Sequence, residues 1–131
     1  MDTGELQRLI DEDGLRGLTS NPAIFEKAIS NSTDYDSDIE TLAKKEDDNE
    51  SIFFDLAIKD IQRAADLFRR VYDKTKCEDG FVSLEVSPLL ARDTEGTIKQ
   101  ARDLWKRVDR KNVMIKIPST AEGLPAIRKC I

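Results

Sequence analysis

The sequence contains no histidine and only two cysteines, Cys77 and Cys130, which lie far apart. Zinc and similar metals are usually bound by clusters of histidine and cysteine, so the usual ligand sets for such a metal are absent. Without an imidazole, proton transfer must use aspartate, glutamate, lysine or tyrosine. The two separated cysteines indicate free thiols in a reducing compartment rather than a disulfide.

Long apolar runs and an excess of positive charge are also missing. No apolar stretch approaches the roughly 20 residues of a membrane-spanning helix, and the acidic start MDTGELQRLIDEDG lacks the apolar core of a signal peptide. Lysine and arginine number 21 against 26 aspartates and glutamates, a net charge of −5. We therefore expect no membrane partner and no nucleic-acid partner, since the latter needs a basic surface. A cytoplasmic location is expected, or a plastid one if an upstream transit segment was lost.

The 131 residues are 39% hydrophobic and 36% charged, which suits one domain with a charged exterior. Apolar side chains recur every three or four positions over residues 50–73, which predicts the longest helix there. Further helices are expected over residues 3–12, 22–30, 35–44, 93–108 and 121–131, and strands over residues 15–20, 81–87 and 113–117. The charged stretch 44–48 is expected to form a solvated helix end and loop.

Alternation along the three strands places polar side chains on one face of the predicted sheet. In residues 81–87 (FVSLEVS), the aliphatic side chains take one face, and the serines and the glutamate take the other. Strands that alternate with helices imply a parallel sheet with right-handed crossovers. An open doubly wound sheet would have two aliphatic faces, whereas a (β/α)8 barrel carries helices outside and chemistry inside. The pattern therefore favours an α/β fold that is an incomplete (β/α)8 barrel.

Lys116 is the one charged residue within the apolar strand predicted over residues 113–117 (VMIKI). A lysine that is desolvated loses affinity for its proton, and a neutral amine forms a Schiff base with a carbonyl substrate. The alternative is that Lys116 lies near the strand end and extends its ammonium group into water. The sequence pattern leaves both interpretations open.

Three further residues share the polar face near the strand ends. Glu85 is either an ordinary side chain on a solvated strand face or an acid that converges with Lys116. Thr19 and Asn21 stand at the end of the first predicted strand and point the same way. The alternative for Asn21 is that it caps the helix that begins at Pro22.

Four motifs in this order and spacing resemble transaldolase: GLTSNPA at 17–23, VSLEVS at 82–87, DTE at 93–95 and NVMIKIPST at 112–120. The wording LRGLTSNPAIFEKAI and EGLPAI is similar to the bacterial and plant subfamily with the longer sequence pattern, and the resemblance covers the N-terminal half of the barrel. It implies a class I aldolase-type (β/α)8 barrel. Lys116 is then the Schiff-base lysine, Glu85 helps to hold the catalytic water, and Asn21 is the active-site asparagine, with Thr19 beside it in a substrate-binding role.

The implied reaction of the pentose phosphate pathway moves a dihydroxyacetone unit from sedoheptulose 7-phosphate to glyceraldehyde 3-phosphate. The resemblance implies sugar-phosphate substrates and no metal or cofactor. A fructose-6-phosphate aldolase-like enzyme is an alternative that shares the lysine chemistry and differs in the acceptor.

The resemblance also implies functional residues that this chain lacks. The family's catalytic aspartate lies on a strand upstream of residue 3, and the threonine that positions the water and the phosphate-binding serine and arginine lie beyond residue 131. We therefore expect residues 1–131 to be a partial barrel domain, truncated at both ends and inactive alone. A further alternative is a non-catalytic truncated paralogue. Open sheet edges favour pairing, so a homo-oligomer is also possible.

Overall fold

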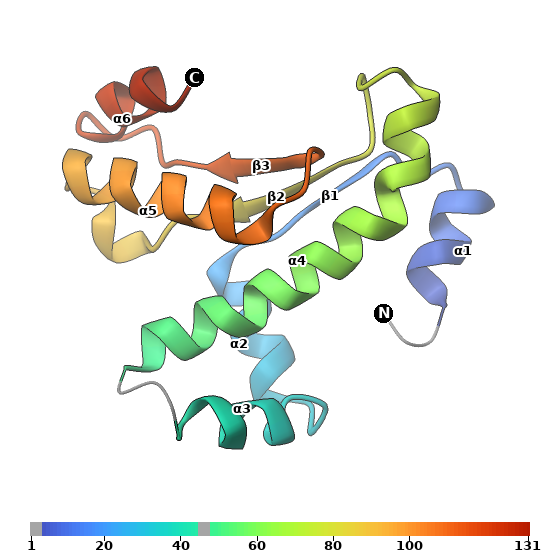
Figure 1. Ribbon diagram of the computed structural model, residues 1–131, viewed down its shortest axis with the longest axis horizontal. Helices are drawn as coiled ribbons and strands as arrows, with labels where there is room; N and C mark the ends of the chain where they lie inside the picture. The colour runs from blue at the N-terminus through green and yellow to red at the C-terminus, as the bar shows by residue number, and fades with distance from the viewer. Residues whose placement is uncertain (1–3, 45–47) are drawn as a thin grey trace.

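The computed structural model describes residues 4–44 and 48–131, which form one parallel sheet with helices around it (Figure 1). The strands β1 (Gly17–Thr19), β2 (Phe81–Glu85) and β3 (Val113–Lys116) are adjacent in chain order, and both pairs are parallel. The helices are α1 (Glu5–Asp11), α2 (Pro22–Ser30), α3 (Asp36–Leu42), α4 (Asn49–Lys74), α5 (Thr94–Val108) and α6 (Gly123–Cys130), with a short 3-10 helix η1 (Pro88–Leu90) after β2.

The two long helices begin at side chains that accept hydrogen bonds from backbone N–H groups of the first turn. Asp48 accepts from Glu50 and Ser51 at the start of α4. Asp93 accepts from Gly96 at the start of α5. Such caps satisfy donors that have no partner inside the helix. They explain why the two long helices begin where they do.

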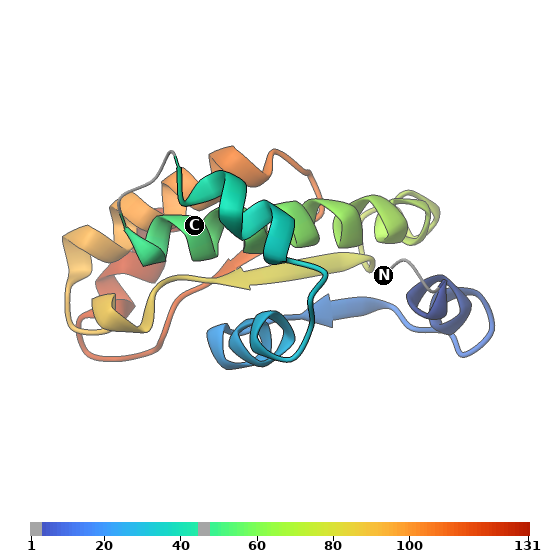
Figure 2. The same ribbon diagram turned by 90° about the horizontal axis from the view of Figure 1, so that it is seen from below.

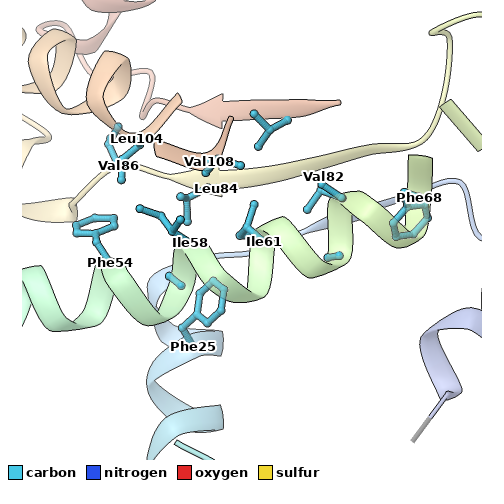
Figure 3. Packing of buried hydrophobic residues seen from close by; sticks show 14 of the residues in the cluster. Phe25, Phe54, Ile58, Ile61, Phe68, Val82, Leu84, Val86, Leu104 and Val108 are labelled. Carbon is cyan, nitrogen blue, oxygen red and sulfur yellow. The ribbon is translucent and has the colours of Figure 1, made fainter. Parts of the chain in front are cut away.

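The hydrophobic core lies between β2 and the two long helices. Val82, Leu84 and Val86 are at most 2% exposed and point toward α4 and α5 (Figure 3). The facing side chains of the helices, with Phe25 of α2 at the margin, are Phe54, Ile58, Ile61, Phe68, Leu104 and Val108. Removing apolar surface from water stabilises a fold by roughly 25 cal/mol per Å². This burial therefore turns the aliphatic face of the sheet toward α4 and α5.

The helices α4 and α5 form a layer along one side of β2 (Figure 2). The neighbouring strand of the same sheet, β1, and the helix α2 lie on the side of β2 away from α4 and α5. The predicted parallel sheet with one aliphatic face is confirmed. Within residues 4–44 and 48–131, no helix is long and apolar enough to cross a membrane.

Several predicted bounds change. The first strand ends at Thr19 rather than at residue 20, and the second ends at Glu85 rather than at residue 87. Ser87 does not continue the solvated face: it is 3% exposed, and its hydroxyl accepts a hydrogen bond from the N–H of Leu89 in η1. The short helix η1, which follows β2, was not predicted. Helix α3 is shorter than the predicted 35–44, and residues 3 and 45–47 of the predicted segments lie outside the described residues.

Candidate functional site

The candidate site lies on the face of the sheet opposite the aliphatic core, at the C-terminal ends of β2 and β3. Glu85 and Lys116 are the last matched pair of the parallel ladder. The Lys116 Nζ lies 3.5 Å from the Glu85 Oε2, and their side chains are 42% and 27% exposed. The described residues therefore pair Lys116 with a carboxylate and leave it accessible to water. The sequence alone could not distinguish this geometry from a lysine that burial desolvates.

Thr19 lies on the same face, one strand further along. It pairs with Ser83 in the β1–β2 register, and the Ser83 hydroxyl donates to the Thr19 Oγ1 at 3.0 Å. The neighbouring Ser20 hydroxyl donates to the Ser83 backbone oxygen at 2.6 Å. The hydroxyls of Thr19 and Ser83 thus lie side by side on the sheet face that carries Glu85 and Lys116.

Asn21 is not part of β1, because the strand ends two residues earlier. Its side-chain oxygen accepts a hydrogen bond from the Ile24 N–H at 2.9 Å, and Pro22 is the first residue of α2. The capping alternative is therefore confirmed. Among the described residues, none accepts a hydrogen bond from its amide nitrogen.

A polar cleft in the helical layer was not predicted from the sequence. The cleft has a volume of about 460 Å³ and lies between α3, α4 and the turn before β3. The Tyr35 hydroxyl donates to Asp60 at 2.6 Å there. Burial, and then this hydrogen bond to a carboxylate, raise the pKa of Tyr35 to about 12. No sequence pattern links residues 25 positions apart on different helices, so this contact had no detectable signal.

A groove of about 1480 Å³ runs along β3 between α5 and α6. Val113, Met114, Ile115 and Ile117 line it on the β3 side. Neither Glu85 nor Lys116 is among its lining residues, so the candidate site lies outside this groove.

The chemistry available on this face is that of a primary amine beside a carboxylate. The amine can attack a carbonyl carbon once it has lost its proton, and the carboxylate can hold a water or accept a proton. Within the described residues, no group of three or more cysteine, aspartate or glutamate side chains is placed to hold a metal ion.

A parallel sheet with helices on its aliphatic face, and with an amine and a carboxylate at the strand ends, defines a chain of the (β/α)-barrel class. Residues 1–131 match the family model described as Transaldolase/Fructose-6-phosphate aldolase. The chain belongs to that family, and its fold is part of the family's barrel.

Curated relatives agree with this assignment. A protein from Trichodesmium erythraeum named Transaldolase is 48% identical over 131 residues, which cover 100% of this chain and 34% of the relative. Transaldolase from Saccharopolyspora erythraea is also 48% identical over 131 residues, 100% of this chain and 35% of the relative. Transaldolase from Thermobifida fusca is 50% identical over 125 residues, 95% of this chain and 34% of the relative. The chain thus spans about a third of the length of the curated relatives it matches.

Proposed function

We propose that this chain carries the Schiff-base lysine and an assisting carboxylate of a transaldolase of the pentose phosphate pathway. The observation that carries the proposal is the position of the Lys116 Nζ, 3.5 Å from Glu85 at the C-terminal ends of adjacent parallel strands. Catalytic groups in barrels of this class stand at that end of the strands. The relatives named Transaldolase support transfer over simple aldol cleavage.

The proposed reaction begins when the neutral amine of Lys116 attacks the C2 carbonyl of sedoheptulose 7-phosphate. Loss of water gives a protonated imine. The C3–C4 bond then breaks: its electron pair moves into the imine to form an enamine, the C4 hydroxyl loses its proton, and erythrose 4-phosphate leaves. The enamine attacks the aldehyde carbon of glyceraldehyde 3-phosphate, and the aldehyde oxygen takes up a proton. Water then adds to the regenerated imine and breaks its C–N bond, which releases fructose 6-phosphate and restores Lys116.

Glu85 is proposed to hold the water that takes part in imine formation and hydrolysis. Its carboxylate is on the same sheet face as Lys116 and is more shielded from solvent. Thr19 and Asn21 are proposed to bind the hydroxyls of the sugar, with the Thr19 hydroxyl and the Asn21 amide nitrogen as the contacting groups. Thr19 is on the sheet face of Lys116, and Asn21 follows the end of the same strand.

Two further functions of the proposed reaction have no residue assigned to them. The proton acceptor for the C4 hydroxyl and the phosphate-binding groups have no counterpart among the proposed site residues. We therefore propose that residues 1–131 alone form the imine without completing transfer, and that the proton acceptor and the phosphate-binding groups complete the reaction in a chain as long as the curated relatives.

The test is to incubate the chain with fructose 6-phosphate, reduce with borohydride, and map adducts by peptide mass spectrometry. We expect the reduced adduct on Lys116 in clear excess over Lys99, an exposed lysine on α5. Lys116→Arg should abolish the Lys116 adduct and leave the Lys99 background unchanged. Equal labelling of the two lysines would contradict the proposed function, and robust turnover in a coupled transfer assay would contradict the assignment of functions outside the chain.

A further inference from the structure

The β2–β3 ladder ends at the candidate site, and Lys116 is the last residue of β3. The sheet therefore fixes the chain before Lys116 but not the chain after it. Its carbonyl accepts the last hydrogen bond between the two strands, from the Val86 N–H at 3.1 Å. The chain then leaves the sheet through Ile117 and Pro118, and proline has no N–H to donate. The position of Lys116 relative to Glu85 therefore also depends on what holds the loop of residues 117–122.

Thr120 is the residue that ties this loop down. Its hydroxyl donates to the backbone oxygen of Ala91, in the loop after β2, at 2.5 Å. The same hydroxyl oxygen accepts from the Gly123 N–H at 2.9 Å, and the Thr120 carbonyl accepts from the Leu124 N–H at 3.0 Å. One half-buried side chain thus joins the loop after Lys116, the loop after Glu85 and the start of α6.

Two neighbouring contacts close the same junction. The Thr94 hydroxyl, at the first residue of α5, donates to the Glu122 backbone oxygen at 2.7 Å, which adds a bond from the start of α5 to the loop after Lys116. Gly123 packs against the chain just after Lys116, since a Cβ placed there would lie 1.9 Å from the Pro118 backbone oxygen. Only glycine permits that approach.

The other side of the junction is anchored to α5. The buried Thr97 hydroxyl donates to the Leu90 backbone oxygen at 2.9 Å, and the Gln100 side-chain oxygen accepts from the Ser87 N–H at 2.6 Å. Residues 87–91 are therefore fixed to a helix whose own inner face is in the core. When Thr120 binds Ala91, it fastens the Lys116 loop to a rigid support.

We propose that Thr120 is a positioning residue for Lys116: its hydroxyl holds the loop after β3 against the loop after β2, and this sets the separation between the Lys116 amine and Glu85. The functional meaning of this separation rests on the proposed Schiff-base role of Lys116. The positioning of Lys116 by Thr120 does not depend on that role, because it follows from the hydrogen bonds at the strand ends. The positioning and the Schiff-base role can therefore be tested separately.

The placement is tested with a zero-length carbodiimide, which joins a carboxylate and an amine only when they are in contact. Peptide mapping of the 131-residue chain should show a Glu85–Lys116 amide. Thr120→Val removes the hydroxyl at nearly constant shape and should lower the yield about fivefold, the population change for one ordinary hydrogen bond. Thr120→Ser should restore most of the yield. Thr41→Val removes a hydroxyl-to-carbonyl bond on distant α3 and should leave the yield unchanged.

A thermal melt of each variant separates loss of position from loss of folding. An unchanged cross-link yield in folded Thr120→Val would overturn the proposal, as would failure of Thr120→Ser to restore it. If Thr120→Val does not fold, Thr94→Val, which removes the bond from the start of α5 to the loop of residues 117–122, takes its place with the same expected direction. Borohydride trapping on the same variants then reports the functional consequence: a wild-type chain that cross-links but gives no Lys116 adduct would refute the proposed function and leave the positioning role intact.

Discussion

The Lys116 Nζ lies 3.5 Å from the Glu85 Oε2 at the last matched pair of the β2–β3 ladder. Both side chains are too exposed for this ion pair to contribute much to folding, because exposed pairs are typically worth about 0–1 kcal/mol. The pair lies on the sheet face that the core does not use. A small contribution to stability is what the proposed chemical role of the pair requires.

This difference between chemistry and stability can be measured directly. Lys116→Met should change the free energy of unfolding by less than about 1 kcal/mol while it abolishes the borohydride-trapped adduct at that position. Urea unfolding followed by circular dichroism gives the first quantity and peptide mapping the second. A loss of several kcal/mol would show that the lysine is a structural residue.

Asn112, four residues earlier, should behave in the opposite way. It is 1% exposed, and its amide nitrogen donates to the backbone oxygens of Ala65 and Gly80, each at 2.9 Å. Asn112→Asp places a carboxylate against two carbonyl oxygens, so we expect a loss of at least about 3 kcal/mol at neutral pH. The control is Asn49→Asp, the same change at the exposed start of α4, which should have almost no effect or stabilise slightly. Similar unfolding midpoints for the two variants would contradict the structural role of Asn112.

Gly123 offers a steric test of the loop after Lys116. Gly123→Ala would place its Cβ on the Pro118 backbone oxygen, so that the loop or the start of α6 must move. We expect faster amide hydrogen exchange over residues 117–126, with little change over β2. Leu124→Ala, at an exposed position of the same helix, should leave the exchange pattern as it is. If both variants exchange alike, the close packing of Gly123 is not needed.

The Tyr35–Asp60 hydrogen bond predicts an alkaline pH dependence of stability. The pKa of Tyr35 is raised from 10.0 to about 12 in the folded chain, so the folded state holds this proton more tightly than the unfolded state. The contribution is complete below pH 10 and is lost as the pH rises toward 12, where unfolding becomes easier. The difference in unfolding free energy between wild type and Tyr35→Phe should shrink over that interval. A difference that stays constant across it would contradict the raised pKa.

Much of the fold was predictable because its signals are local. Alternation in residues 81–86 gave the two faces of β2, and the apolar spacing of residues 50–73 predicted α4 to within one residue of its observed bounds. A local sequence pattern does not decide between two structural roles when the same residues are common in both. The pattern Ser-Asn-Pro suits both a strand end and a helix cap, and only the structure shows the Asn21 side chain accepting from Ile24.

The contacts that tie the site together were not predictable, because they join distant positions. The Thr120 hydroxyl meets a backbone oxygen 29 residues earlier, and backbone oxygens carry no sequence signature. Asn112 is similar, since an asparagine between a basic turn and a strand is typical of an exposed loop, yet here it is buried. The environment of Lys116 is a further case: the sequence places it among apolar neighbours, whereas its exposure depends on what covers the open face of the sheet.

The most direct test of the central claim is to identify the bond that Lys116 forms. Fructose 6-phosphate labelled with carbon-13 at C2 is incubated with the chain and borohydride, and the labelled carbon is followed by NMR and then located by peptide mapping. We predict one dominant secondary-amine carbon signal, located on Lys116 and absent from Lys116→Arg. Label spread evenly over exposed lysines, or a signal that persists in Lys116→Arg, would contradict the assignment of Lys116 as the Schiff-base residue.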